Sequence, residues 1–239
     1  MPRVARIVVP HYAHHVTQRG NNRQDVFFVD DDRRAYLAFL KQRCEAAGVA
    51  ILGYCLMSNH VHLIAMPRSE DGLARAIGRT HFLYTQYVNR LHGRSGHLWQ
   101  NRFYSCVLDE AHLWAALCYV ERNPVRARLV RLPWKYPWSS APAHAGVGPD
   151  DTGLLDLEAW TAEWDASRWQ EQLRQPEDEL LTRQLRRRTH TGRPLATDTW
   201  LSKVERRLGR RLRADPLGRP KKPKRPAKAK SGRAEQRNT

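Results

Sequence analysis

Residues 49–66 have the sequence VAILGYCLMSNHVHLIAM, which is rich in residues that favour strands. The polar pair Ser58-Asn59 interrupts this stretch near its middle, which predicts two antiparallel strands joined by a tight connection. Because side chains alternate between the two faces of a strand, His60 and His62 are expected to project to one side and their apolar neighbours to the other. The second strand therefore combines a core-facing side with a side that carries two imidazoles.

The sequence on either side of this pair alternates between strand and helix patterns. Pro124 is expected to end the last helix at Asn123. The predicted order β-α-β-β-α-β-α favours an α+β sandwich, with an antiparallel sheet and helices on one face. The further predicted elements are a strand at 15–19, helices at 30–47, 73–91 and 109–123, and a strand within 98–104.

The chain has 239 residues and a formal charge of +17, which makes nucleic acid the expected partner. Its hydrophobic share of 41% is too high for general disorder. No apolar run is long enough to span a bilayer, so we expect no membrane association and a cytoplasmic location. The four cysteines are scattered and lack metal-ligand spacing, which favours buried thiols.

Most of the net charge lies near the C-terminus, where residues 183–239 hold 20 Lys and Arg against four Asp and Glu. Apolar residues spaced three and four apart from Leu201 to Leu212 predict one amphipathic helix, flanked by arginines that include Arg210 and Arg211. Residues 216–239 mix Pro, Gly and Lys and are predicted to be a disordered tail that binds phosphates. The alternative is a solvated tail without a function.

Two patterns suggest chemistry. His60 and His62 on one strand face can hold one divalent metal ion, although two structural histidines would have the same pattern. Tyr119 and Asn123 stand four residues apart on a predicted helix and share a face, where a half-buried tyrosine and a helix-terminal asparagine are the alternative. A metal held by two imidazoles and an amide oxygen can polarise a phosphodiester, and a tyrosine can then be the nucleophile.

Three motifs resemble those of one known family. These motifs are GYCLMSNHVHLI at 53–64, LWQ at 98–100 and YVERNPVRA at 119–127. Together they are similar to the HUH-superfamily single-tyrosine transposases, and within these to the REP-associated tyrosine transposases. The resemblance covers about residues 12 to 140. It implies a ferredoxin-like catalytic domain, a Mg²⁺ or Mn²⁺ cofactor, and cleavage of single-stranded DNA at palindromic repeat hairpins through a 5′-phosphotyrosine.

Carried over by position, the resemblance implies metal ligation by His60 and His62, with Tyr119 as the nucleophile and Asn123 as the third ligand. Many insertion-sequence relatives have glutamine where Asn123 stands, so a shorter amide must reach the metal here. Tyr104 is a distant second candidate for the nucleophile.

The DNA-contacting residues are expected among aromatic and basic side chains near these motifs. An aromatic segment that also offers hydrogen-bond donors is suited to gripping unpaired bases, although core aromatics beside a polar loop would have the same composition. Basic side chains near the site and in the C-terminal helix would contact phosphates, and plain surface arginines are the alternative. The predicted DNA-binding residues are Arg19, Trp99, Asn101, Arg102, Tyr104, Arg126, Arg210 and Arg211.

The chain is accordingly divided into an HUH-type catalytic domain at 1–145, a connecting helical segment at 146–182, a basic helical module at 183–215 and the tail. The expected activity is metal-dependent cleavage and rejoining of single-stranded or hairpin repeat DNA by a monomer or homodimer. Two alternatives stay open, which are a non-catalytic DNA-binding protein derived from such an enzyme, and a replication initiator or relaxase. The absence of a Walker-type motif from the sequence weighs against the last alternative.

Overall fold

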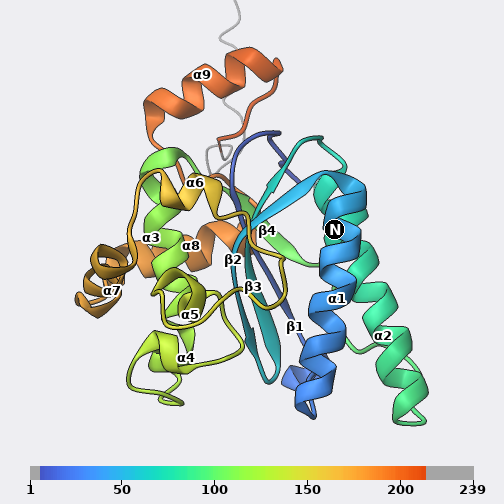
Figure 1. Ribbon diagram of the computed structural model, residues 1–239. Helices are drawn as coiled ribbons and strands as arrows, with labels where there is room; N and C mark the ends of the chain where they lie inside the picture. The colour runs from blue at the N-terminus through green and yellow to red at the C-terminus, as the bar shows by residue number, and fades with distance from the viewer. Residues whose placement is uncertain (1–5, 214–239) are drawn as a thin grey trace, which may run out of the picture.

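A computed structural model describes residues 6–213, so the predicted tail at 216–239 lies outside the described residues. Its centre is a four-stranded antiparallel sheet with the strand order β2-β3-β1-β4 (Figure 1). The strands are β1 (His14–Arg19), β2 (Val49–Met57), β3 (His60–Pro67) and β4 (Tyr104–Val107). With α1 between β1 and β2 and α2 between β3 and β4, this connectivity is ferredoxin-like. The predicted fold class is confirmed.

The β2–β3 hairpin sets the register of the histidines. Met57 pairs with His60 across the two-residue connection, as the polar pair in the sequence predicts. In the neighbouring pairing, Thr17 of β1 stands opposite His62 and Arg19 stands opposite His60. The central strands β1 and β3 therefore present Thr17, Arg19, His60 and His62 on the same face of the sheet.

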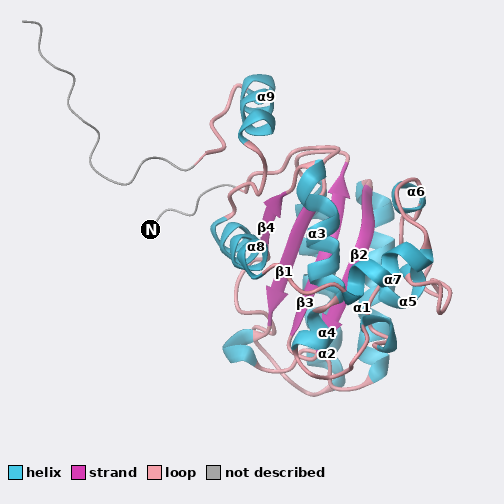
Figure 2. Cartoon of the chain, turned by 90° about the vertical axis from the view of Figure 1, so that its left-hand side faces the viewer, coloured by secondary structure: helices cyan, strands magenta, loops and turns pink. Residues whose placement is uncertain are grey.

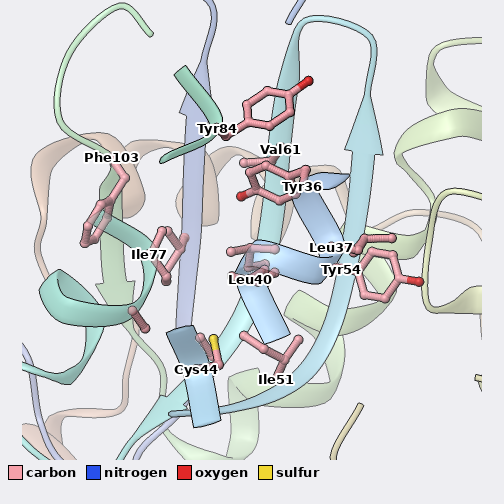
Figure 3. Close-up of a cluster of buried hydrophobic side chains, with 14 of the residues drawn as sticks. Tyr36, Leu37, Leu40, Cys44, Ile51, Tyr54, Val61, Ile77, Tyr84 and Phe103 are labelled. Atoms are coloured by element: carbon pink, nitrogen blue, oxygen red, sulfur yellow. The ribbon is translucent and has the colours of Figure 1, made fainter. Parts of the chain in front are cut away.

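Helices cover both faces of the sheet, which corrects the expectation of helices on one face. α1 (Asp30–Ala47) and α2 (Arg79–Leu91) lie on one side, and α3 (Glu110–Glu121) lies on the other (Figures 1 and 2). Figure 3 shows part of the first core, where Leu40 of α1 meets Val61 of β3. The second core buries Leu117 of α3 against the opposite face. The sequence predicted each apolar face, but not that the helices divide between two faces.

Several elements surround this framework. The helix expected from residue 73 begins with a π-helical turn, η2 (Ala74–Gly78), before α2. C-terminal to α3, the chain folds over its side of the sheet and ends in α8 (Glu179–Thr191) and α9 (Asp198–Leu208). The other short elements are η1 (Asn21–Arg23), α4 (Asn123–Arg126), η3 (Pro133–Lys135), α5 (Ala141–His144), α6 (Glu158–Thr161) and α7 (Ala166–Arg174).

Two predicted helices end earlier than expected. α3 ends at Glu121 and α4 starts at Asn123, so Tyr119 and Asn123 are not on one continuous helix. The helix expected through Leu212 ends at Leu208, because Gly209 adopts a left-handed conformation with a φ of 58°. Leu212 is nevertheless buried, in the small apolar cluster that α9 forms with the chain before β1.

The four cysteines are free and buried, as predicted. Within residues 6–213, none of the helices has the length and apolar character needed to cross a bilayer.

Candidate active site

A pocket of about 710 Å³ lies where β1 and β3 face the end of α3, α4 and the side of α8. It gathers seven of the predicted site residues, although they come from five different elements and loops. Those seven are Arg19, His60, His62, Tyr104, Tyr119, Asn123 and Arg126. The remaining lining residues include His15, Gln100, Arg186, Thr189 and His190.

The phenol ring of Tyr119 lies against the imidazoles of the sheet. Its centroid is 5.6 Å from that of His62, and the two rings are nearly perpendicular. His60 and His62 also meet edge to face, with their centroids 5.0 Å apart. Residues that are about 60 positions apart in the sequence thus converge on one pocket, because α3 crosses the sheet face on which β3 displays its histidines.

A relay of hydrogen bonds fixes the orientation of His62. The Thr189 hydroxyl donates to the carbonyl of Leu185, so it accepts the 2.7 Å hydrogen bond from Nδ1 of His15. Nε2 of neutral His15 is then an acceptor, and it bonds Nδ1 of His62 at 2.8 Å. The proton of His62 consequently sits on Nδ1, and Nε2 keeps a lone pair.

Burial keeps these imidazoles neutral. Desolvation, helped by Arg19 and Arg126, lowers the pKa of His60 to about 4. Desolvation and the neighbouring His60 lower the pKa of His62 well below its usual value, and burial lowers the pKa of His15 to about 3. A neutral imidazole is the form that binds a metal ion.

Two imidazole nitrogens and one amide oxygen fit the predicted metal ligands. Nδ1 of His60 bonds the side-chain oxygen of Asn59, which leaves Nε2. The amide nitrogen of Asn123 donates to the carbonyls of Tyr119 and Val120, which leaves its oxygen. Within residues 6–213, no group of three or more His, Cys, Asp or Glu side chains is arranged to hold a metal ion.

Two arginines contact the candidate nucleophile. The guanidinium of Arg126 lies over the Tyr119 ring, 4.2 Å from its centroid, and also donates to the Tyr119 carbonyl. Nε of Arg186 donates to the Tyr119 hydroxyl at 3.2 Å. Positive charge beside the phenol attracts a phosphate.

The other predicted DNA-binding residues lie outside this pocket. Trp99 is buried, donates to the carbonyl of His81 and packs against that residue's ring, so it belongs to the core and its face is not free to stack on a base. This corrects the expectation for Trp99. Asn101 and Arg102 are exposed on the loop before β4, and Arg210 and Arg211 are exposed after α9.

Sequence reasoning missed several residues that line the pocket, among them His15, Arg186, Thr189 and His190. The signal for His15 was present, since it shares a strand face with Arg19. No local signal identified the α8 residues, because only tertiary packing brings α8 against β4. α8 runs across the predicted boundary between the segments 146–182 and 183–215. The division into domains stays a prediction.

Comparisons with known proteins agree with this geometry. Residues 8–123 match the model of the family described as "Transposase IS200 like". A Haemophilus influenzae protein named as a REP-associated tyrosine transposase is 28% identical over 142 residues, which cover 53% of this chain and 77% of the relative. A solved structure of a REP-associated tyrosine transposase bound to a REP hairpin has a TM-score of 0.51 and 17% identity, and covers 64% of this chain and 90% of that one. At such low identity the structural likeness concerns the fold alone.

The matched segment contains β1, both histidines of β3 and Tyr119, and it ends at Asn123. Residues 8–123 of the chain therefore match the IS200-like transposase family, and the resemblance found in its motifs is confirmed.

Proposed function

We propose that this protein cleaves and rejoins single-stranded or hairpin repeat DNA through a covalent 5′-phosphotyrosine on Tyr119. The observation that carries the proposal is the position of the Tyr119 phenol, which lies against His62 in a pocket lined by arginines. The names of the similar proteins support transposase chemistry, and a relative of the same fold was solved with a REP hairpin.

Tyr119 is suited to the nucleophilic step. Its phenolate oxygen attacks the scissile phosphorus, a bond between that oxygen and phosphorus forms, and the bond to the 3′ oxygen breaks. The strand is then held as a 5′-phosphotyrosine, and the 3′ oxygen takes up one proton, which balances the proton that the phenol lost, and leaves as a free hydroxyl. Because a phenolate is a better leaving group than a sugar alkoxide, a 3′-hydroxyl can reverse the step and rejoin a strand without external energy.

The two arginines orient and stabilise the reacting groups. Arg186 donates to the phenol oxygen, so it holds that oxygen in place and stabilises its anion. Arg126 packs over the ring and restricts its rotation. Arg19 is exposed at the pocket and is available to a phosphate of the strand.

His60, His62 and Asn123 would hold the divalent cation, with Nε2 of each imidazole and the amide oxygen as the ligands. When bound, a Mg²⁺ or Mn²⁺ ion supplies Lewis-acid polarisation of the phosphodiester. The chain's own contribution is to keep both imidazoles neutral and to fix their lone pairs toward the pocket.

The test is an incubation of the protein with labelled hairpin DNA and Mn²⁺, followed by denaturing electrophoresis. The wild type is expected to form a covalent protein–DNA band, and Tyr119→Phe is expected to lose it. Tyr87→Phe is the matched control, because Tyr87 lies on α2 and does not line the pocket. DNA binding without an adduct in the wild type would contradict the proposal and favour a non-catalytic binding protein.

A further inference from the structure

Two more pockets adjoin the candidate active site around the edge strand β4. The first has a volume of about 290 Å³ and lies between Arg102 and Arg193. The second has a volume of about 520 Å³ and lies over Phe103, between the loop before β4 and the start of α2. We call the three pockets together the β4 groove.

Shared lining residues show that the three pockets are neighbours. Gln100 lines both the active-site pocket and the pocket over Phe103. Tyr104 and His190, whose rings stack with centroids 4.9 Å apart, line the active-site pocket and the pocket beside Arg193. Arg102 lines both of the outer pockets. A bound chain that runs from Tyr119 around β4 would meet these neighbouring pockets in turn.

The β4 groove has basic walls and no Asp or Glu among its lining residues, all of which lie in the part of the chain that the structure describes. The large pocket between α1 and the 134–155 segment is different, because Asp30, Asp150 and Asp151 line it. A groove that excludes carboxylates attracts a polyanion. Its basic residues are Arg6, Arg19, Arg102, Arg126, Arg186 and Arg193.

The outer arginines lie close enough to repel each other. Burial and, to a lesser degree, the charge of Arg102 lower the pKa of Arg6 to about 10. The Arg6 guanidinium is already engaged, since it packs 3.7 Å from the Phe103 ring centroid and donates to the Phe103 carbonyl. Arg102 is exposed, and a phosphate beside it would relieve this repulsion.

An exposed aromatic ring stands at the far end of the groove. Phe82 of α2 is 49% exposed and lines the pocket over Phe103. The Arg79 guanidinium lies 4.8 Å from its centroid. Ala74 and Gly78 of the π-helical turn line the same pocket, and their small size leaves room beside the ring. Exposed aromatics beside arginines are the platforms on which proteins stack unpaired bases.

We propose that the β4 groove binds single-stranded DNA that continues from the scissile phosphate at Tyr119, with Arg102 on its backbone and a base stacked on Phe82. The inference deepens the proposed function and rests on it for the position of the scissile phosphate. A duplex does not suit the site, because stacking on Phe82 requires an unpaired base.

The test measures the binding of a labelled oligo(dT) of about 12 nucleotides, within the site sizes of single-strand grooves, by fluorescence anisotropy. All variants are made in the full chain with Tyr119→Phe, so that no adduct can form. Phe82→Ala is expected to weaken binding roughly tenfold, the range of one lost stacking contact. Arg102→Ala is expected to reduce the slope of log Kd against log salt by about 0.7, the value for one phosphate on a single strand.

Each variant has a matched control on another surface. Phe28 is 43% exposed and has Arg94 over its ring, so Phe28→Ala removes a similar platform far from the groove. Arg34 is exposed and paired with Asp31, so Arg34→Ala removes the same charge. Equal Kd values for Phe82→Ala and Phe28→Ala, or equal salt slopes for the two arginine variants, would overturn the proposal.

Failure of the groove and failure of the proposed function are distinguishable. If wild-type protein forms the covalent adduct while Phe82→Ala leaves DNA binding unchanged, the proposal for the β4 groove is refuted and the proposed function is supported. If Phe82→Ala weakens DNA binding while the wild type forms no adduct, the proposal for the β4 groove is supported and the proposed function is refuted.

Discussion

At the scale of single residues, the chemistry of His62 is set by a threonine that lies 127 positions along the chain. The Thr189 hydroxyl donates to a helix carbonyl, so its oxygen accepts a hydrogen bond from Nδ1 of His15. Nε2 of His15 in turn accepts a hydrogen bond from Nδ1 of His62. Such outer partners orient a metal-binding imidazole and select its tautomer. α8, which lies beyond the family match, thus orients His62, a proposed metal ligand within that match.

Replacing Thr189 by valine tests this relay. The change removes the acceptor for the His15 proton while keeping the side-chain shape, so Mn²⁺ affinity is expected to fall about 10- to 100-fold, as for other outer partners of metal ligands. Isothermal titration with Mn²⁺ measures the affinity without any DNA. Thr191→Val is the control, because its hydroxyl bonds only carbonyls of its own helix and it is exposed. Equal affinities of the two variants would refute the relay.

At the scale of elements, a buried carboxylate ties α3 to the C-terminal segments. Glu121 ends α3 and is fully buried. Its side chain accepts from Ser140, from Nδ1 of His144 and, at 2.9 Å, from the indole of Trp169. These contacts join α3 to α5 and α7 only two residues after Tyr119. A buried carboxylate is stable only with such partners.

Truncating Glu121 tests this anchor. Glu121→Ala leaves three buried polar groups without their acceptor and is expected to lower the free energy of unfolding by about 3–5 kcal/mol. Glu121→Gln keeps one acceptor and is expected to cost less. Urea titration followed by tryptophan fluorescence measures both. Glu171→Ala on α7 is the control and, because Glu171 is exposed, should change the free energy by less than about 0.5 kcal/mol. If Glu121→Ala lowered the free energy of unfolding as little as the control does, the role of Glu121 in joining α3 to the C-terminal segments would be refuted.

Element boundaries also explain what sequence reasoning could and could not predict. The hairpin at 58 and 59 and the start of α3 beside Asp109 follow from local chemistry, and both were predicted. The early end of α9 at Gly209 is also local and was missed. The placement of α3 on the opposite face from α1, and of α8 beside β4, depends on packing between distant segments that no local pattern encodes.

At the scale of the whole molecule, buried neutral histidines couple stability to pH. His14 donates from Nδ1 to the Tyr12 carbonyl and accepts from the Val9 amide, so both nitrogens are satisfied only in the neutral form. Burial lowers the pKa of His14 to about 4 and that of His81 to about 3. An unfolded histidine has a pKa of about 6.5, so the unfolded chain binds more protons below that pH.

Stability is therefore expected to be level above about pH 7 and to fall as the pH drops from about 6.5 toward 4, each such histidine contributing about 1.4 kcal/mol per pH unit. His14→Gln removes one titrating group. Between about pH 6.5 and 4.5, the free energy of unfolding of this variant should therefore fall less steeply than that of the wild type, by about 1.4 kcal/mol per pH unit. Urea midpoints across this range measure the effect. His97→Gln, at an exposed histidine, is the control and should keep the wild-type slope. A slope for His14→Gln equal to that of the wild type would contradict this account.

The convergence of the site across the whole chain was only partly predictable. His60, His62 and Tyr119 were named from motif spacing, and the fold brings them into one pocket. Trp99 was named from composition, which does not distinguish a core ring from an exposed one, and the structure buries it. The roles of His60 and His62 as metal ligands and of Tyr119 as the nucleophile remain predictions, which the arrangement of the pocket supports.

The most direct test of the central claim is to locate the DNA on the protein. Trypsin releases Tyr119 and its rival Tyr104 in one peptide, residues 103–122, whereas cleavage after Glu110 separates them. The adduct formed with hairpin DNA is digested with nuclease and a glutamate-specific protease, and its peptides are sequenced by tandem mass spectrometry. The account predicts a phosphonucleotide on Tyr119 within residues 111–121. The modification on Tyr104, or on any residue other than Tyr119, would contradict it.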